Sequence, residues 1–193
     1  MPSYYRRLPH WHPEGQPLFL TWRLHGSLPT HRFFPPGSLN GGKAFTAMDR
    51  LLDQARTGPV YLAQPDIASL VVEAILDGRD RLDHYNLHAF VVMANHVHLL
   101  ITPKAPVPKL TQRLKGTTAR RANERLRLTG RAFWQEEGYD HWVRNEREFF
   151  RIRAYIEDNP VRAGLVIARE DFPWSSAAAW MQDAKAGLKP GAA

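Results

Sequence analysis

The chain has 193 residues, of which 44% are hydrophobic, and it carries a formal net charge of +7 at pH 7. This length suits one domain with a substantial core and leaves little room for a second. The sequence has no cysteine, which excludes disulfides and thiolate metal ligands, and its positive charge is typical of proteins that bind nucleic acid. No apolar run reaches the length of a membrane span or an export signal, so we expect a soluble, cytoplasmic protein without a membrane partner.

The N-terminal part of the chain is predicted to form one strand and two helices. Residues 16–25 are typical of a strand, residues 27–42 of a loop rich in proline and glycine, and residues 43–55 of a helix. A second helix is predicted from Asp66, a favourable N-cap residue, to about Arg79. Its apolar residues recur at helical spacing and should cover a sheet.

Two strands in close succession, residues 84–93 and 96–102, are predicted to form a hairpin with a tight turn at residues 94 and 95. The second strand begins with His96-Val97-His98. Side chains alternate along a strand, so both imidazoles point to one face while Val97 points to the other. Such a pair can bind one divalent cation, although two half-buried histidines with ordinary hydrogen-bond partners would give the same pattern.

The segment from Lys109 to Arg127 is predicted to be a helix with a basic surface. It contains seven basic residues and one acidic residue, Glu124, a local net charge of +6 (7 − 1). Ordinary solvated helices mix both signs, so this pattern favours phosphate contacts over a merely solvated outer face. The seven residues are Lys109, Arg113, Lys115, Arg120, Arg121, Arg125 and Arg127.

An aromatic segment, residues 133–144, is predicted to end in a fourth strand. Trp134, Tyr139 and Trp142 offer rings that can stack on unpaired bases, but core packing explains the same residues equally well.

A final helix is predicted from Glu146 to Asp158, where Asn159-Pro160 ends it. Arg151, Tyr155 and Asn159 are spaced by four residues and share one ridge, so their side chains are expected to project toward a common point. By itself, a helical tyrosine beside an apolar stripe is more often a packing residue than a catalytic one.

The order strand, helices, hairpin, helix, strand is that of a ferredoxin-like sheet with an added helix. We therefore expect an α+β, ferredoxin-like or RRM-like fold with four antiparallel strands, the histidines on a central strand and Tyr155 on a C-terminal helix. Residues 1–183 are expected to form a single domain, and residues 184–193 a flexible tail.

Several motifs in these elements resemble those of the single-tyrosine HUH transposases. They are Asn95-His96-Val97-His98-Leu99-Leu100 and the run of residues 155–166, YIEDNPVRAGLV. Three further motifs, FWQ at 133–135, YDH at 139–141 with Arg144, and FPWSS at 172–176, resemble the REP-associated tyrosine transposases, domesticated bacterial relatives linked to repetitive extragenic palindromes. Two positions depart from the family pattern: Ala94 stands where relatives usually have proline, and Glu157 where they often have histidine.

The resemblance implies an endonuclease and strand transferase that acts on single-stranded DNA beside a palindromic hairpin, on the bacterial nucleoid, as a monomer or a homodimer. His96, His98 and, as the third ligand, Asn159 would bind Mg²⁺ or Mn²⁺. Tyr155 would be the nucleophile and form a 5′-phosphotyrosine. On chemical grounds, a neighbouring cation or Arg151 would favour its phenolate. The ligands would all be neutral and would leave the charge of the cation undiluted. The expected DNA contacts are the seven basic residues, Arg151, Trp134 and Trp142.

Two other functions remain compatible with the sequence. One is a non-catalytic, RRM-like module that binds nucleic acid, in which the histidines have no chemical role. The other is a metal-dependent nuclease with water as its nucleophile.

Overall fold

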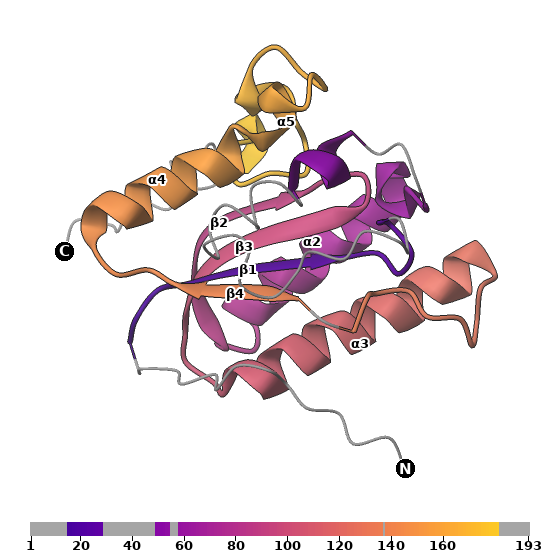
Figure 1. Ribbon diagram of the computed structural model, residues 1–193. Helices are drawn as coiled ribbons and strands as arrows, with labels where there is room; N and C mark the ends of the chain where they lie inside the picture. Colours follow the sequence, from indigo (N-terminus) through magenta and orange to yellow (C-terminus); the bar gives the residue numbers. More distant parts are fainter. Residues whose placement is uncertain (1–14, 29–48, 55–57, 137, 182–193) are drawn as a thin grey trace, which may run out of the picture.

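Four strands form one antiparallel sheet in the computed structural model, which describes residues 15–28, 49–54, 58–136 and 138–181. The strands are β1 (Leu18–Arg23), β2 (Tyr85–Val92), β3 (His96–Pro103) and β4 (Tyr139–Trp142), in the order β2-β3-β1-β4. β3 therefore lies in the centre of the sheet, between β2 and β1 (Figure 1). The predicted α+β class, the ferredoxin-like strand order and the central position of the histidine strand are confirmed.

Helices cover both faces of the sheet. On one face lie α2 (Pro65–Asp80) and α3 (Val107–Leu126), and on the other lies α4 (Glu146–Glu157), followed directly by the short α5 (Asn159–Arg162) (Figure 1). The described residues also form two 3-10 turns, η1 (Tyr61–Ala63) and η2 (Arg169–Asp171), and residues 49–53 are helical. None of the described helices combines the length and apolarity needed to cross a bilayer.

The alternation of β3 divides its side chains between the two layers. Val97, Leu99 and Ile101 belong to the apolar core beneath α2 and α3. Leu100 belongs to a second apolar cluster, which includes Ile152 and Ile156 of α4. His96 and His98 share the face of Leu100, so they point toward α4 rather than toward α2 and α3.

One sequence expectation, the N-cap of α2, needs adjustment. α2 begins at Pro65 with Gln64 as its N-cap, so Asp66 lies in the first helical turn and is not the cap. Proline suits this position because its φ is preset and the first helical N–H has no intrahelical partner. The predicted helix 43–55 is described only at its end, and the predicted tail 184–193 lies outside the described residues.

The β2–β3 hairpin closes as predicted and is tied to residues 49–53. The Met93 N–H donates to the carbonyl of His96 over 2.9 Å, which leaves Ala94 and Asn95 as the turn. The Asn95 amide Nδ2 donates to the carbonyl oxygen of Leu52 over 3.0 Å. This bond fixes the helical residues 49–53 beside the start of β3.

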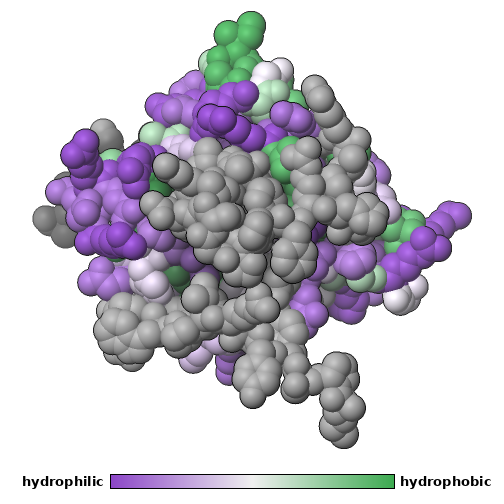
Figure 2. Space-filling view, viewed as in Figure 1, coloured by the Kyte–Doolittle hydropathy of each residue, from purple (hydrophilic) through white to green (hydrophobic). Residues whose placement is uncertain are grey.

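The chain after α5 returns to the free edge of β2. Ser175 bridges to Val91, and the Val92 N–H donates to the Trp174 carbonyl over 2.9 Å. Between α5 and this edge the chain forms an apolar projection, where Leu165 is 52% and Ile167 is 96% exposed (Figure 2).

Candidate active site and metal centre

His96 presents one defined nitrogen to the interior of the site. Its ring is fully buried, and its Nδ1 lies 2.7 Å from Oδ1 of Asn95. The bond from Asn95 Nδ2 to the Leu52 carbonyl orients the amide, so Oδ1 is the atom that faces His96. An amide oxygen only accepts, so Nδ1 of His96 carries the proton and Nε2 keeps its lone pair for a metal ion.

His98 lies beside His96 on the same strand face, with the ring centroids 4.7 Å apart. It is also fully buried, and its Nδ1 is 2.8 Å from Oγ1 of Thr21 on β1. Both rings are thus oriented through Nδ1 and direct Nε2 toward the same place.

Asp49 brings a carboxylate to the two imidazoles. Its Oδ1 lies 3.1 Å from Nε2 of His98 and 3.6 Å from Nε2 of His96, and its side chain is 2% exposed. Neighbouring ligands of an octahedral ion with bonds of about 2.1 Å stand about 3 Å apart. The spacing of these three groups therefore fits one divalent cation.

Several buried polar atoms around this group have no hydrogen-bond partner among the described residues. Asp53, one helical turn after Asp49, places Oδ1 3.7 Å from Nε2 of His96. Burying polar acceptors without partners is costly, and a bound cation would remove that cost. The atoms are Asp49 Oδ1, Asp53 Oδ1, His96 Nε2 and Asn159 Oδ1.

The protonation states also suit a cation. Burial, together with the neighbouring His98, lowers the pKa of His96 to about 3, so its ring is neutral at physiological pH. Burial alone would raise the pKa of Asp49, but His98, His96 and Asn159 outweigh it and hold the pKa below its usual value. Burial and the Asp49 carboxylate raise the pKa of Asp53 to about 7. Neutral imidazoles and an ionised carboxylate are the ligand forms that metal binding needs.

The structure adds Asp49 as a candidate to the expected ligands His96, His98 and Asn159. Asn159 is fully buried, and its Nδ2 lies 3.5 Å from Oδ2 of Asp49, while Asp49 itself faces the histidines. A cation held by Asp49 would have one charged ligand, which differs from the expectation that all ligands are neutral. Asp49 and Asp53 lie four residues apart in the predicted helix 43–55. This spacing places both carboxyl groups on one face of the helix and is the sequence feature that could have indicated them as candidate ligands.

Tyr155 projects from α4 toward the histidines. Its ring centroid lies 5.8 Å from that of His98 and 6.4 Å from that of Phe19. Its hydroxyl donates to Oδ2 of Asp49. A phenol therefore lies directly beside the group that fits a cation.

The arginine at Tyr155 is not the expected one. Arg151 is exposed and pairs with Glu148 over 3.2 Å, while the guanidinium carbon of Arg162 lies 4.7 Å from the Tyr155 ring centroid. Four residues advance an α-helix by more than one full turn, so positions four apart drift around the axis. Because of this drift, the side chain of Arg151 points toward solvent. The arginine beside the Tyr155 ring is instead Arg162 of α5.

The basic helix α3 lies on the opposite face of the sheet from Tyr155 (Figure 1). Four of the seven basic residues between Lys109 and Arg127 pair with or donate to other groups of the protein. Lys115 donates to the carbonyls of Gln135 and Glu136, Arg120 pairs with Glu124, Arg121 pairs with Glu73, and Arg125 donates to the Asp66 carbonyl. The other three, Lys109, Arg113 and Arg127, are exposed.

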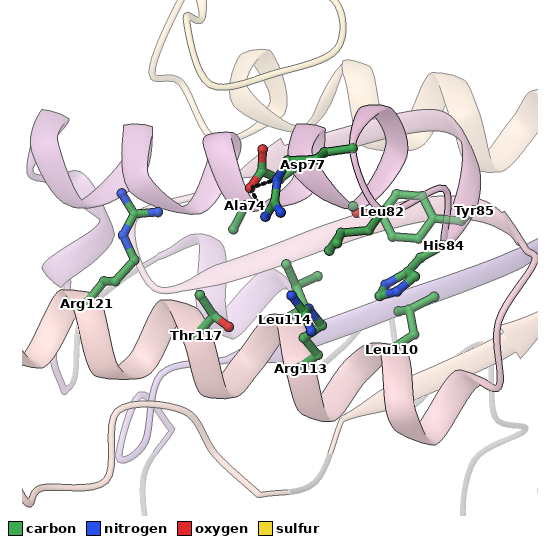
Figure 3. A pocket seen from close by; sticks show the side chains of 12 residues that line it. Ala74, Asp77, Leu82, His84, Tyr85, Leu110, Arg113, Leu114, Thr117 and Arg121 are labelled. Carbon is green, nitrogen blue, oxygen red and sulfur yellow. Dashed lines mark hydrogen bonds and ion pairs between the residues drawn. The ribbon is translucent and has the colours of Figure 1, made fainter.

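A shallow hollow between α2 and α3 gathers part of this charge (Figure 3). Arg113, Arg121 and His84 line it, together with Arg81, which is paired with Asp77 over 2.8 Å. This basic surface and the histidine site are separated by the sheet.

The aromatic candidates divide between core and partial exposure. Trp134 is 7% exposed, and its Nε1 donates to Oγ1 of Thr118 over 2.9 Å, so the structure corrects the expectation of an accessible ring. Trp142 is partly buried against the same core. Glu157 is buried, pairs with Arg153 over 3.2 Å and accepts a bond from Ser176, away from the histidines.

Comparisons with known proteins agree with the motifs. Residues 66–159 match the family described as "Transposase IS200 like", a segment that contains both histidines, Tyr155 and Asn159 but not Asp49. No curated protein matches the chain. A solved structure of a REP-associated tyrosine transposase bound to a REP hairpin is 21% identical, with 97% of this chain and 88% of that chain covered and a TM-score of 0.60. A putative transposase from Deinococcus radiodurans is 17% identical, with 80% and 98% covered and a TM-score of 0.41.

Proposed function

This chain matches the IS200-like transposases over residues 66–159 and has the fold of a REP-associated tyrosine transposase, and from this we propose that it cleaves and rejoins single-stranded DNA beside a hairpin. The observation that carries the proposal is the meeting of Tyr155 with the two histidines around Asp49, from three separate segments of the chain. A phenol beside a cation-binding group suits attack on a phosphodiester.

The catalytic step is assigned to Tyr155. Its phenolic oxygen forms a bond to the scissile phosphorus, the bond from phosphorus to the 3′ oxygen breaks, the phenol gives up its proton, and the departing 3′ oxygen takes one up. The products are a 5′-phosphotyrosine and a free 3′-OH. Because the covalent intermediate keeps the energy of the broken linkage, another 3′-OH can reverse the step and join a different strand.

His96, His98 and Asp49 would hold the divalent cation, with Asn159 and Asp53 at its margin. When bound, Mg²⁺ or Mn²⁺ polarises a non-bridging phosphate oxygen and offsets charge in the transition state. Arg162, over the Tyr155 ring, adds a further positive charge beside the phenol.

The basic residues of α3 are assigned to DNA phosphates away from the scissile bond, because the sheet separates them from Tyr155. The three exposed residues without described partners are the best candidates. Each phosphate contact adds about 0.7 to 0.9 to the slope of log affinity against log salt. Replacing Arg113 with alanine should reduce that slope by this amount, whereas Arg79→Ala, which removes a partner of Asp80 on α2, should leave it unchanged.

A denaturing gel tests the catalytic proposal. Incubation of the protein with hairpin-bearing single-stranded DNA and Mg²⁺ or Mn²⁺ should give a covalent protein–DNA adduct. Tyr155→Phe should abolish the adduct, and the matched control Tyr61→Phe should retain it. A His96→Ala, His98→Ala double variant should bind DNA without cutting it.

Other outcomes of the same gel would replace the proposal. Cleavage without an adduct would indicate a nuclease with water as its nucleophile. Binding without cleavage in either metal would indicate a non-catalytic nucleic-acid module.

A further inference from the structure

One carboxylate spans the distance from the imidazoles to the phenol. Oδ1 of Asp49 faces Nε2 of His98 and of His96, at 3.1 and 3.6 Å. Oδ2 accepts the hydroxyl of Tyr155 and lies 3.5 Å from Nδ2 of Asn159. We propose that Asp49 is a positioning residue that couples cation binding to the nucleophile, with Oδ1 on the cation and Oδ2 on the phenol. The name nucleophile rests on the proposed function.

Three further contacts hold the ring of Tyr155. Phe19 and His98 contact the ring in edge geometry, and Arg162 lies over its face. The hydroxyl itself donates to the carboxylate of Asp49. A group that reacts in line with a scissile bond must be placed closely, since an error of about 1 Å can cost about 10²-fold in rate.

Asp49 is itself held in register with the histidines through Asn95. The Asn95 amide orients His96 through Oδ1 and binds the Leu52 carbonyl through Nδ2. Leu52 is 1% exposed, so the turn that carries Asp49 is anchored in the core. The side chain of Asn95 therefore positions both His96 and Asp49, and Asp49 in turn accepts the hydrogen bond from the phenol of Tyr155.

The coupling can be measured without DNA, on the full chain with 3-fluorotyrosine at position 155. Without metal, the ¹⁹F signal should differ between the parent protein and Asp49→Ala, because the phenol loses its acceptor. In the parent protein, Mg²⁺ at concentrations that calorimetry shows to be saturating should shift the signal again. In Asp49→Ala the second shift should be absent, and Asp49→Glu should restore part of it.

Asp53→Asn is the matched control, because it removes a carboxyl from the same helical turn. Its metal-free signal should coincide with that of the parent protein. Coincident metal-free signals for the parent protein and Asp49→Ala would overturn the proposal. So would an equal displacement in Asp53→Asn, or a parent signal that Mg²⁺ leaves in place although calorimetry detects binding.

The rate of adduct formation gives a second readout. With saturating DNA and Mg²⁺, Asp49→Ala should form the adduct at least 10²-fold more slowly, while its affinity for DNA is retained. If no adduct forms in any variant but the ¹⁹F response is as expected, the proposed function fails and the coupling stands. If the adduct forms and the ¹⁹F response is missing, the coupling fails alone.

Discussion

The Asp53 carboxyl lies one helical turn from Asp49 and is only 15% exposed. Burial and the negative charge of Asp49 raise its pKa to about 7, so part of the cation-free protein holds a proton there at neutral pH. A cation bound beside it would favour the ionised form, so binding should release that proton.

Asp53→Asn should stabilise the cation-free protein more at pH 8 than at pH 5. The folded pKa lies above the unfolded value of 3.8, so the stability contributed by Asp53 is present at low pH and is lost as the pH rises through 7. Asparagine does not ionise, and for a carboxyl with some remaining exposure we expect a gain of about 1–2 kcal/mol at pH 8. Urea denaturation in a chelator from pH 5 to 8 measures it.

The low pKa of His96 gives the opposite slope, with stability rising between about pH 3 and 6.5. Both proteins keep His96, so this contribution cancels in the difference between them. A gain that is the same at pH 5 and pH 8 would contradict the prediction.

Arg162→Ala should slow adduct formation about 5-fold, because a cation over an aromatic ring contributes about 1 kcal/mol. Arg151→Ala should slow it less, since its side chain is 74% exposed and paired with Glu148. Single-turnover rates at saturating DNA make the comparison. A larger effect of Arg151→Ala than of Arg162→Ala would indicate that Arg151, as the helical spacing predicted, is the arginine that assists Tyr155.

At the scale of elements, α2 and the first residue of β2 are in close contact at Gly78. The Tyr85 hydroxyl donates to the Ile75 carbonyl over 2.6 Å, directly beside this glycine. A Cβ on Gly78 would lie 2.2 Å from the Tyr85 oxygen, so only glycine leaves room for the ring. The packing of α2 on the sheet depends on this absence of a side chain.

Gly78→Ala should lower the free energy of unfolding by about 1–3 kcal/mol, the usual cost of overpacking a core. Gly116→Ala on α3 is the matched control, because nothing lies within 4 Å of its added Cβ. It should stabilise the helix by about 0.5–1 kcal/mol. Urea titrations of both variants measure these changes. Equal free energies of unfolding for Gly78→Ala and Gly116→Ala would show that the Tyr85 ring can shift without cost.

At the scale of the whole molecule, the sheet separates two surfaces with different chemistry. One face, beneath α4, holds the histidines, Asp49 and Tyr155, and the other carries α3 and its arginines (Figure 1). The site joins residues 49–53, β3 and the α4–α5 junction, so a cation bound there would link segments far apart in the chain. Cation binding should therefore stabilise the whole folded domain against unfolding.

Mn²⁺ should raise the melting temperature of the protein. At 100 times the dissociation constant, the gain in stability is about 2.7 kcal/mol. For a chain of this size each kcal/mol corresponds to about 2–4 °C, so the expected rise is about 5–10 °C. Calorimetry should find no rise in a His96→Ala, His98→Ala variant, while His84→Ala, on the opposite face, should respond as the parent does. An equal rise in the double variant would place the ion elsewhere.

The elements that the sequence predicted well are those set by local spacing. The period-2 pattern of β3 placed both histidines on one face. The apolar stripe of α4 and the Asn159-Pro160 pair after it gave the bounds of this helix within a residue, because these features depend on residues near one another in the chain. The motifs that contain Tyr155 and the histidines are likewise short runs of consecutive residues, so the sequence shows them without any knowledge of which elements meet.

Tertiary structure alone decided which distant side chains meet. Asp49 contacts the histidines and the phenol although the three lie in separate segments of the chain. Arg162, and not Arg151, lies beside the phenol because α5 places it over the Tyr155 ring. The burial of Trp134 and the placement of α3 behind the sheet also follow from packing between layers. Local spacing fixes the direction of a side chain within its own element, but the partner it contacts depends on how the elements are arranged in space.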